Sequence, residues 1–300
     1  MAATVLGPRP GEESIATGTT MAAVTLRVAD LDAMAVFYRE GVGLHVVSES
    51  ASSIELGLGA RPVLVLEHTP ALRHAGPGEA GLYHVAIVFD TRSALAAAVL
   101  STARRYPESF MGSADHLVSE AFYFADPEGN GLELYWDRDR TQWSWMHGRI
   151  VVGAEGLDPH DYLRRHVSEA GLEGPLVDAA GGVGHVHLSI GDTSSARDFY
   201  VGALGFAEPI ASPTEEALFV SAGGYHHHLA LNTWGTRGAG RRRLALGLGR
   251  IDIELPVADD IAAVADRLRH YRVPVRDDGR SIEAEDPWAN VIRITPRTAQ

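Results

Sequence analysis

The sequence Leu26-Arg-Val-Ala-Asp30 returns 162 residues later as Leu188-Ser-Ile-Gly-Asp192. Two further landmarks recur at the same offset: Phe37-Tyr38 with Phe199-Tyr200, and Gly43 with Gly205. Each copy indicates an alternating strand, an Asp that caps a helix with its carboxylate, an amphipathic helix ending in Phe-Tyr, and a Gly before the next strand. The chain is therefore built on an internal repeat.

A second unit also occurs twice. His84-Val-Ala-Ile-Val88 matches Arg250-Ile-Asp-Ile-Glu254, and Asp126-Pro-Glu-Gly-Asn matches Asp286-Pro-Trp-Ala-Asn. The Asp-Pro-x-x-Asn pattern is typical of a turn between strands. Together the repeats define four modules, each a strand, a helix and two or three further strands: 22–68, 82–136, 183–233 and 247–296.

This pattern predicts an α+β fold of four βαβββ modules. Consecutive modules form a first pair over 22–136 and a second pair over 183–296, joined by a connecting segment at 137–182 with a helix over Pro159–Ala170. Residues 1–20 are interpreted as a disordered extension. Two modules placed side by side make a curved sheet with helices on the convex face and a cup on the other.

Composition narrows the possible functions. The chain has 300 residues, of which 45% are hydrophobic and 22% charged, as in a soluble globular protein. Its net charge of −13 argues against nucleic-acid binding. The absence of Cys and Lys excludes thiolate and Schiff-base chemistry. The sequence has no apolar run long enough to span a membrane, and we expect a cytoplasmic location.

Strand alternation points several side chains into a cup. In the second module His84 lies opposite the apolar face of its strand, and Glu133 lies between Leu132 and Leu134, which face the core. In the third module His185 and His187 share the cup face. We therefore predict that His84, Glu133 and His185 bind a metal ion.

The other two modules cannot build this site. The counterparts of His84, Glu133 and His185 there are Arg250, Arg293 and Ala23. The three candidate ligands meet only if the second module pairs with the third, so we predict that the metal cup comes from these two. Two imidazoles and one carboxylate match the facial triad of non-haem Fe(II) enzymes, and Mn(II) is the possible substitute.

The modules also carry the motifs of a known family. With their first-strand His, their Asp-Pro turns and the following Glu, they resemble the vicinal oxygen chelate superfamily. The segments Gly81-Leu-Tyr-His-Val-Ala-Ile87, Gly184-His-Val-His187 and Ser221-Ala-Gly-Gly-Tyr-His-His-His228 resemble its extradiol ring-cleaving dioxygenases of the catechol 2,3-dioxygenase type. The resemblance implies two cupped sheets and the Fe(II)-dependent cleavage of an aromatic diol with O2.

It also implies roles for four more residues. Tyr123, ten residues before Glu133, and His116 are expected to assist by hydrogen bonds to the substrate. The family's acid–base His matches His227, whereas strand alternation from Leu229 places His228 in the cup and His227 in the core. Both remain candidates, and His226 is expected to matter least.

Other functions share this scaffold. A glyoxalase-like metal-dependent isomerase or lyase is one alternative, and a protein that binds an aromatic compound without turnover is another. Exposed sheet edges make a homo-oligomer plausible. The ring substituents of the substrate cannot be inferred from the sequence.

Overall fold

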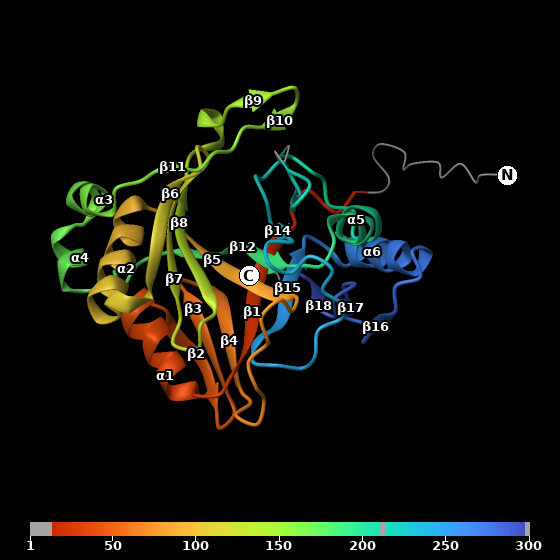
Figure 1. Ribbon diagram of the computed structural model, residues 1–300, viewed down its shortest axis with the longest axis horizontal. Helices are drawn as coiled ribbons and strands as arrows, with labels where there is room; N and C mark the ends of the chain where they lie inside the picture. The colour runs from red at the N-terminus through yellow and green to blue at the C-terminus, as the bar shows by residue number, and fades with distance from the viewer. Residues whose placement is uncertain (1–13, 211–213, 298–300) are drawn as a thin grey trace.

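Figure 1 shows a computed structural model of the chain, which describes residues 14–210 and 214–297. Two mixed sheets of eight strands form its framework. The first, called the β1 sheet, has the order β16 (Val275–Asp277), β17 (Ile282–Glu285), β18 (Val291–Pro296), β15 (Gly247–Leu255), β1 (Thr20–Val28), β4 (Arg61–His68), β3 (Ser53–Leu58) and β2 (His45–Ser50). The second, called the β5 sheet, has the order β11 (Glu155–Gly156), β6 (Phe110–Asp115), β7 (Ser119–Ala125), β8 (Gly131–Asp137), β5 (Gly81–Phe89), β12 (Gly181–Ser189), β14 (Leu229–Asn232) and β13 (Ala217–Val220).

The first and second modules lie in different sheets, and so do the third and fourth, so the pairs expected from chain order over 22–136 and 183–296 do not each share a sheet. Antiparallel pairing of β5 with β12 joins the second and third modules, with Val85 opposite Val186. Antiparallel pairing of β1 with β15 joins the first and fourth, with Thr25 opposite Arg250. The first strands of the second and third modules are thereby neighbours at the centre of the β5 sheet. A cup shared by His84, Glu133 and His185 requires this arrangement.

A helix follows the first strand of each module, and the two predicted Asp caps are confirmed. Asp30 accepts a hydrogen bond from the Ala33 amide at 2.9 Å and begins α1 (Leu31–Val36). Asp192 accepts one from the Ser195 amide at 2.8 Å and begins α5 (Thr193–Arg197). Both helices continue as π-helical segments, η1 (Phe37–Val42) and η4 (Asp198–Ala203). The remaining module helices are α2 (Arg92–Arg105), η2 (Pro107–Ser109) and α6 (Ala258–His270).

Two buried hydrogen bonds tie the modules of different sheets together. The Tyr38 hydroxyl of the first module donates to the Asp126 carboxylate in the turn of the second, at 2.9 Å. The Tyr200 hydroxyl of the third donates to the Asp286 carboxylate of the fourth, also at 2.9 Å. In both halves of the chain, the Tyr of the Phe-Tyr motif therefore binds the Asp of the Asp-Pro motif, and these contacts link the two sheets.

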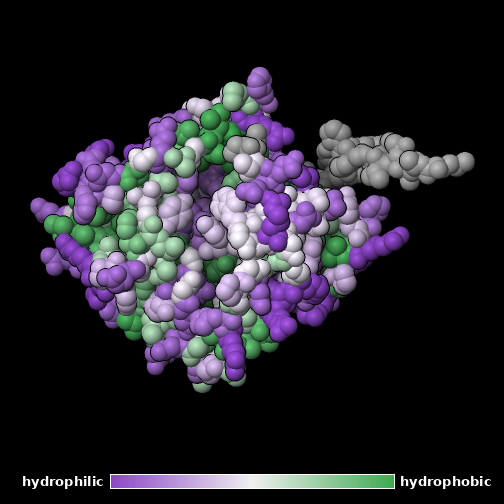
Figure 2. All heavy atoms as spheres, in the orientation of Figure 1, coloured by the Kyte–Doolittle hydropathy of each residue, from purple (hydrophilic) through white to green (hydrophobic). Residues whose placement is uncertain are grey.

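One apolar core runs through both sheets and their helices. On β5 it takes Val85, Ile87 and Phe89, which are at most 1% exposed. Figure 1 shows α1 and α2 on one side of the molecule and α5 and α6 on the other, with the strands between. On the space-filling view, hydrophilic residues cover much of the visible face and apolar residues reach it in separate patches (Figure 2). The opposite face of the β5 sheet, which carries His84, is not covered by these helices and can hold a functional site.

The connecting segment contributes more structure than its sequence indicated. It holds η3 (Arg140–Gln142), a hairpin of β9 (Trp145–Met146) and β10 (Arg149–Ile150), and β11 at the sheet edge. The helix expected over Pro159–Ala170 is two helices, α3 (Pro159–His166) and α4 (Glu169–Glu173). Ser168 separates them, because its hydroxyl accepts the Gly171 amide and caps the second.

The expectation of a disordered extension over 1–20 is wrong for its last part. Ile15 is 3% exposed and its amide donates to the Gly205 carbonyl at 2.8 Å, and β1 begins at Thr20. Burial of the Ile15 side chain holds this stretch against the third module. Residues 1–13 lie outside the described part of the chain. Among the helices of the described residues, none has the length and apolarity needed to cross a membrane.

Candidate metal centre and pocket

The candidate ligands come from three neighbouring strands of the β5 sheet. Ala86 on β5 has Glu133 of parallel β8 opposite it on one side and His185 of antiparallel β12 on the other. His84 precedes Ala86 by two residues and so shares its face of the sheet. Because the side chain at the centre of the group is only a methyl, three larger polar groups have room to meet above it.

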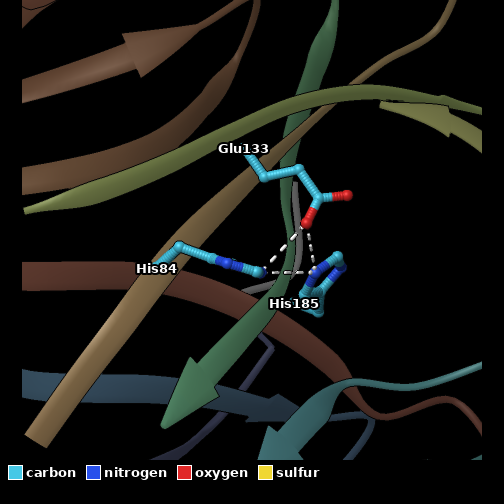
Figure 3. A group of neighbouring side chains, drawn as sticks. All are labelled: His84, Glu133 and His185. Carbon is cyan, nitrogen blue, oxygen red and sulfur yellow. Dashed lines mark hydrogen bonds and ion pairs between the residues drawn. The ribbon is translucent and has the colours of Figure 1, made fainter. Parts of the chain in front are cut away.

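The three side chains converge on one point, as Figure 3 shows. The Oε2 atom of Glu133 lies 3.0 Å from Nε2 of His84 and 3.2 Å from Nε2 of His185, and these two nitrogens are 3.3 Å apart. All three residues are buried, with exposed fractions of 6% or less. Each therefore offers one ligand atom, and the three atoms lie within 4.8 Å of one another.

The electrostatics of the group suit a divalent cation. Burial alone would raise the pKa of Glu133, but the imidazoles of His185 and His84 outweigh it and hold that pKa well below the usual value. Burial lowers the pKa of His185, although Glu133 opposes the shift. An ionised carboxylate beside neutral imidazoles is the protonation state in which these groups bind a metal. The residues present thus fit a metal of the facial-triad type.

The β1 sheet has ion pairs at the corresponding positions. Arg250 and Arg293, the repeat counterparts of His84 and Glu133, both lie against the Asp252 carboxylate, at 2.7 and 3.5 Å. Two guanidinium groups repel a cation, so the two sheets differ in chemistry although they share a repeat.

A fourth imidazole lies beside the group and has a different role. His187 is buried, and its ring centroid is 4.8 Å from that of His84. The side-chain NH2 group of Asn232 donates to its Nε2 at 2.9 Å, so Nε2 is the ring nitrogen without a proton. Since that nitrogen is occupied, His187 packs against the triad instead of completing it.

A pocket of about 770 Å³ opens above the triad, within the size range of small-molecule sites. Tyr83 and Trp234, 44% and 46% exposed, lie at its surface with ring centroids 5.8 Å apart. Much of the remaining lining is apolar: Met111, Val118, Phe124, Leu132, Val152, Ile210 and Phe219. Among the described lining residues there is no Arg, and the chain contains no Lys.

The structure brings Tyr123 and His116 together at the pocket wall. Tyr123 is directly opposite Glu133 across the β7–β8 pair, and its hydroxyl is 2.6 Å from Nε2 of His116. Nδ1 of His116 is 2.7 Å from the Gly153 carbonyl, which only accepts, so Nδ1 is the nitrogen that carries the proton. Burial, with Glu133 next in effect, raises the pKa of Tyr123 far above its usual value, so its hydroxyl stays protonated.

Of the two candidate histidines at the start of β14, His227 lines the pocket. Its ring centroid is 4.1 Å from that of His185. His228 points away, and its Nδ1 accepts the Ala222 amide at 3.2 Å. The alternation that favoured His228 is wrong because β14 begins only at Leu229, and the preceding residues form a turn. Burial, and after it the nearby imidazoles, lower the pKa of His227 well below its ordinary value.

Sequence reasoning did not reveal where His226 lies. This side chain, expected to matter least, is fully buried between Asp137 and His227. The signal was present only as an Asp at the end of the strand that carries Glu133, since nothing local links two residues 89 positions apart.

Both the sequence and the structure of this chain are similar to those of known proteins. The family model of the Glyoxalase/Bleomycin resistance protein/Dioxygenase superfamily matches residues 20–134 and 182–288. The chain belongs to this superfamily. A relative described as catechol-2,3-dioxygenase, from Bacillus subtilis (strain 168), is 34% identical over 279 residues, which are 91% of this chain and 96% of that protein.

Solved structures of the superfamily share the fold. A putative dioxygenase from Bacillus subtilis has a TM-score of 0.62 at 15% identity, covering 95% of this chain and 87% of that one. Glyoxalase I from Zea mays has a TM-score of 0.54 at 16% identity, covering 93% of this chain and 92% of that one. The α+β fold of paired modules predicted from the repeat is therefore confirmed.

Proposed function

We propose that this chain is an extradiol ring-cleaving dioxygenase, which uses a ferrous ion held by His84, Glu133 and His185 to open a catechol-type ring with O2. The observation that carries the proposal is the convergence of these three ligand atoms at the base of an open, largely apolar pocket. A facial triad leaves neighbouring coordination positions free for a diol and O2. The name of the Bacillus subtilis relative supports the same chemistry.

The metal would supply acidity and electron transfer: Fe(II) lowers the pKa of a chelated diol hydroxyl and couples the ring to O2. The chain supplies placement and protons. The Tyr123 hydroxyl lies at the pocket wall and donates to Nε2 of His116 at 2.6 Å, so its oxygen is left to accept a hydrogen bond from the substrate. His227 lies against His185 on another side of the pocket, where it can accept a proton from the substrate and return it.

The lining of the pocket favours an uncharged diol. A substrate carboxylate would be desolvated against apolar side chains without a cationic partner, which is costly. We therefore propose that the natural substrate is a catechol with an apolar substituent or none. Mn(II) in place of Fe(II) is compatible with the same ligands.

A panel of diols tests the proposal. Protein reconstituted with Fe(II) and exposed to air should consume O2 and form a coloured ring-cleavage product from catechol and alkylcatechols. Carboxylated catechols should show kcat/KM lower by roughly 10-fold or more, because their charge is buried unpaired. Measured O2 uptake and product spectra check this.

Three outcomes contradict the proposal in different ways. Catechol that binds without O2 uptake indicates a binding protein. Metal-dependent isomerisation of a substrate without O2 consumption indicates a glyoxalase-like enzyme. Equal or better turnover of carboxylated catechols leaves the dioxygenase but contradicts the uncharged substrate class.

Removing the hydroxyl of Tyr123 gives a further prediction. Tyr123→Phe should keep its metal content and lose roughly 10²-fold in kcat, because a positioned hydrogen-bond partner of the substrate oxygens is lost. Tyr271→Phe, in which an exposed hydroxyl far from the triad is removed, is the matched control. Steady-state kinetics with metal analysis distinguish the two. An unchanged kcat in Tyr123→Phe would show that the hydroxyl only satisfies His116.

A further inference from the structure

We propose that Asp137 and His226 are positioning residues that fix the tautomer of His227, so that its Nε2 is the nitrogen that accepts protons in the pocket. The hydrogen bonds that carry this inference are those of Asp137, His226 and His227 in the structure. Its consequence for ring cleavage rests on the function proposed above.

The chain of contacts starts at the end of the strand that carries Glu133. Asp137, four residues later on β8, places Oδ1 2.8 Å from Nε2 of His226. Its other oxygen, Oδ2, accepts the Tyr225 hydroxyl at 2.7 Å. The Asp137 carboxylate is thereby held by two donors from the turn before β14, and its orientation is fixed.

The imidazole of His226 is held just as firmly. It is fully buried, with ring centroids 4.0 Å from that of Tyr225 and 5.5 Å from that of Trp143. Its Nδ1 is 2.7 Å from Nδ1 of His227. A hydrogen bond between these two nitrogens requires that one of them carries the proton and the other does not.

The carboxylate decides which one it is. An ionised Asp137 only accepts, so the single proton of a neutral His226 is on Nε2, and Nδ1 of His226 is an acceptor. Nδ1 of His227 must then be the donor. The only other ring nitrogen of His227, Nε2, is left without a proton, and His227 is a lining residue of the pocket. The pair therefore directs the lone pair of His227 to the substrate side.

Loss of this control should impair proton transfer without removing any group that touches the substrate. In serine proteases an Asp sets a His tautomer in the same way, and its amide replacement lowers kcat by about 10⁴-fold. The effect here is bounded by the contribution of His227 itself, roughly 10²–10⁴-fold.

Two substitutions of His226 separate its two hydrogen bonds. The amide oxygen of Asn overlays the Nδ1 position and can still accept from His227, whereas the amide nitrogen of Gln overlays Nε2 and can only donate to Asp137. We expect His226→Asn to keep kcat within about threefold of wild type and His226→Gln to lose roughly 10–10²-fold, a part of the acid–base contribution, with KM and metal content unchanged in both. Asp139→Asn, which alters an exposed carboxylate two residues from Asp137, is the control.

Nitrogen-15 NMR of histidine-labelled, metal-free protein tests the tautomer independently of turnover. Wild type should show His227 protonated at Nδ1 and bare at Nε2, and Asp137→Asn, which can donate as well as accept, should show a mixture of tautomers. A wild-type His227 protonated at Nε2 overturns the proposal, as does equal kcat in His226→Asn and His226→Gln. If wild type cleaves no diol, the NMR result still decides the tautomer, and only the proposed function fails.

Discussion

Glu133→Gln protein should fold, purify without iron and show no detectable ring cleavage. The substitution keeps the volume of the side chain but removes the one anionic ligand, and two neutral imidazoles hold Fe(II) weakly. Even residues that only support metal ligands cost about 10–100-fold in affinity when replaced, so losing a ligand should cost more. Wild type should bind about one metal ion per chain, as a single triad implies.

Metal analysis and thermal unfolding measure this effect together. At free metal 100-fold above Kd, binding stabilises the folded state by about 2.7 kcal/mol, so added Fe(II) should raise the Tm of wild type and leave that of Glu133→Gln unchanged. His45→Ala, which removes an exposed histidine from the β1 sheet, should behave as wild type. Full metal content in Glu133→Gln, or in His84→Ala, would contradict the assignment of the ligands.

The fold could be predicted because its physical causes are repeated in the sequence. Alternation along β5, β8 and β12 separates apolar from polar faces, and an Asp begins α1 and α5. Which modules share a sheet could not be predicted from these local patterns. Nothing in the local pattern of β1 or β5 selects its neighbour, and the candidate ligands were the only residues that required the second and third modules to meet.

The Tyr–Asp hydrogen bonds between sheets were also present as motifs. Both Phe-Tyr and Asp-Pro were recognised as repeats, but their partnership depends on three-dimensional approach across 88 and 86 residues. The only sign of this partnership in the sequence was that each motif occurs twice at a similar offset. Assuming that each Phe-Tyr contacts the Asp-Pro turn that follows it would have predicted which helix packs on which turn.

Within the site, sequence reasoning was weakest where a regular strand ends. Gly223 and Gly224 have φ of 60° and 70°, a conformation that favours glycine, and the chain turns there before β14 begins. Alternation counted back from Leu229 cannot pass through this turn, and it selected His228 over His227. The same turn buries His226, whose partner Asp137 lies far away in the sequence, at the end of β8.

His228→Ala should affect stability and leave turnover intact. Its Nδ1 accepts the buried amide of Ala222, and an amide without an acceptor costs about 1–3 kcal/mol. Burial lowers the pKa of His228 to about 3, below its value in the unfolded chain. The unfolded state then binds more protons between about pH 3 and 6.5, so wild type loses stability as the pH falls through this window, and the variant should lose less. Thermal unfolding at several pH values measures both effects.

His227→Ala should keep its metal while kcat falls by roughly 10²–10⁴-fold, the usual contribution of a positioned acid–base group. His227 lines the pocket beside His185 but is not among the three converging ligands, so metal and diol binding should persist. Iron content, diol affinity and single-turnover rates measured on this variant and on His228→Ala give the comparison. Loss of iron from His227→Ala would mean that a fourth imidazole binds the metal and would favour the glyoxalase-like alternative. An unchanged rate with iron retained would move the acid–base role to His116, whose Nε2 already contacts the Tyr123 hydroxyl across the pocket wall.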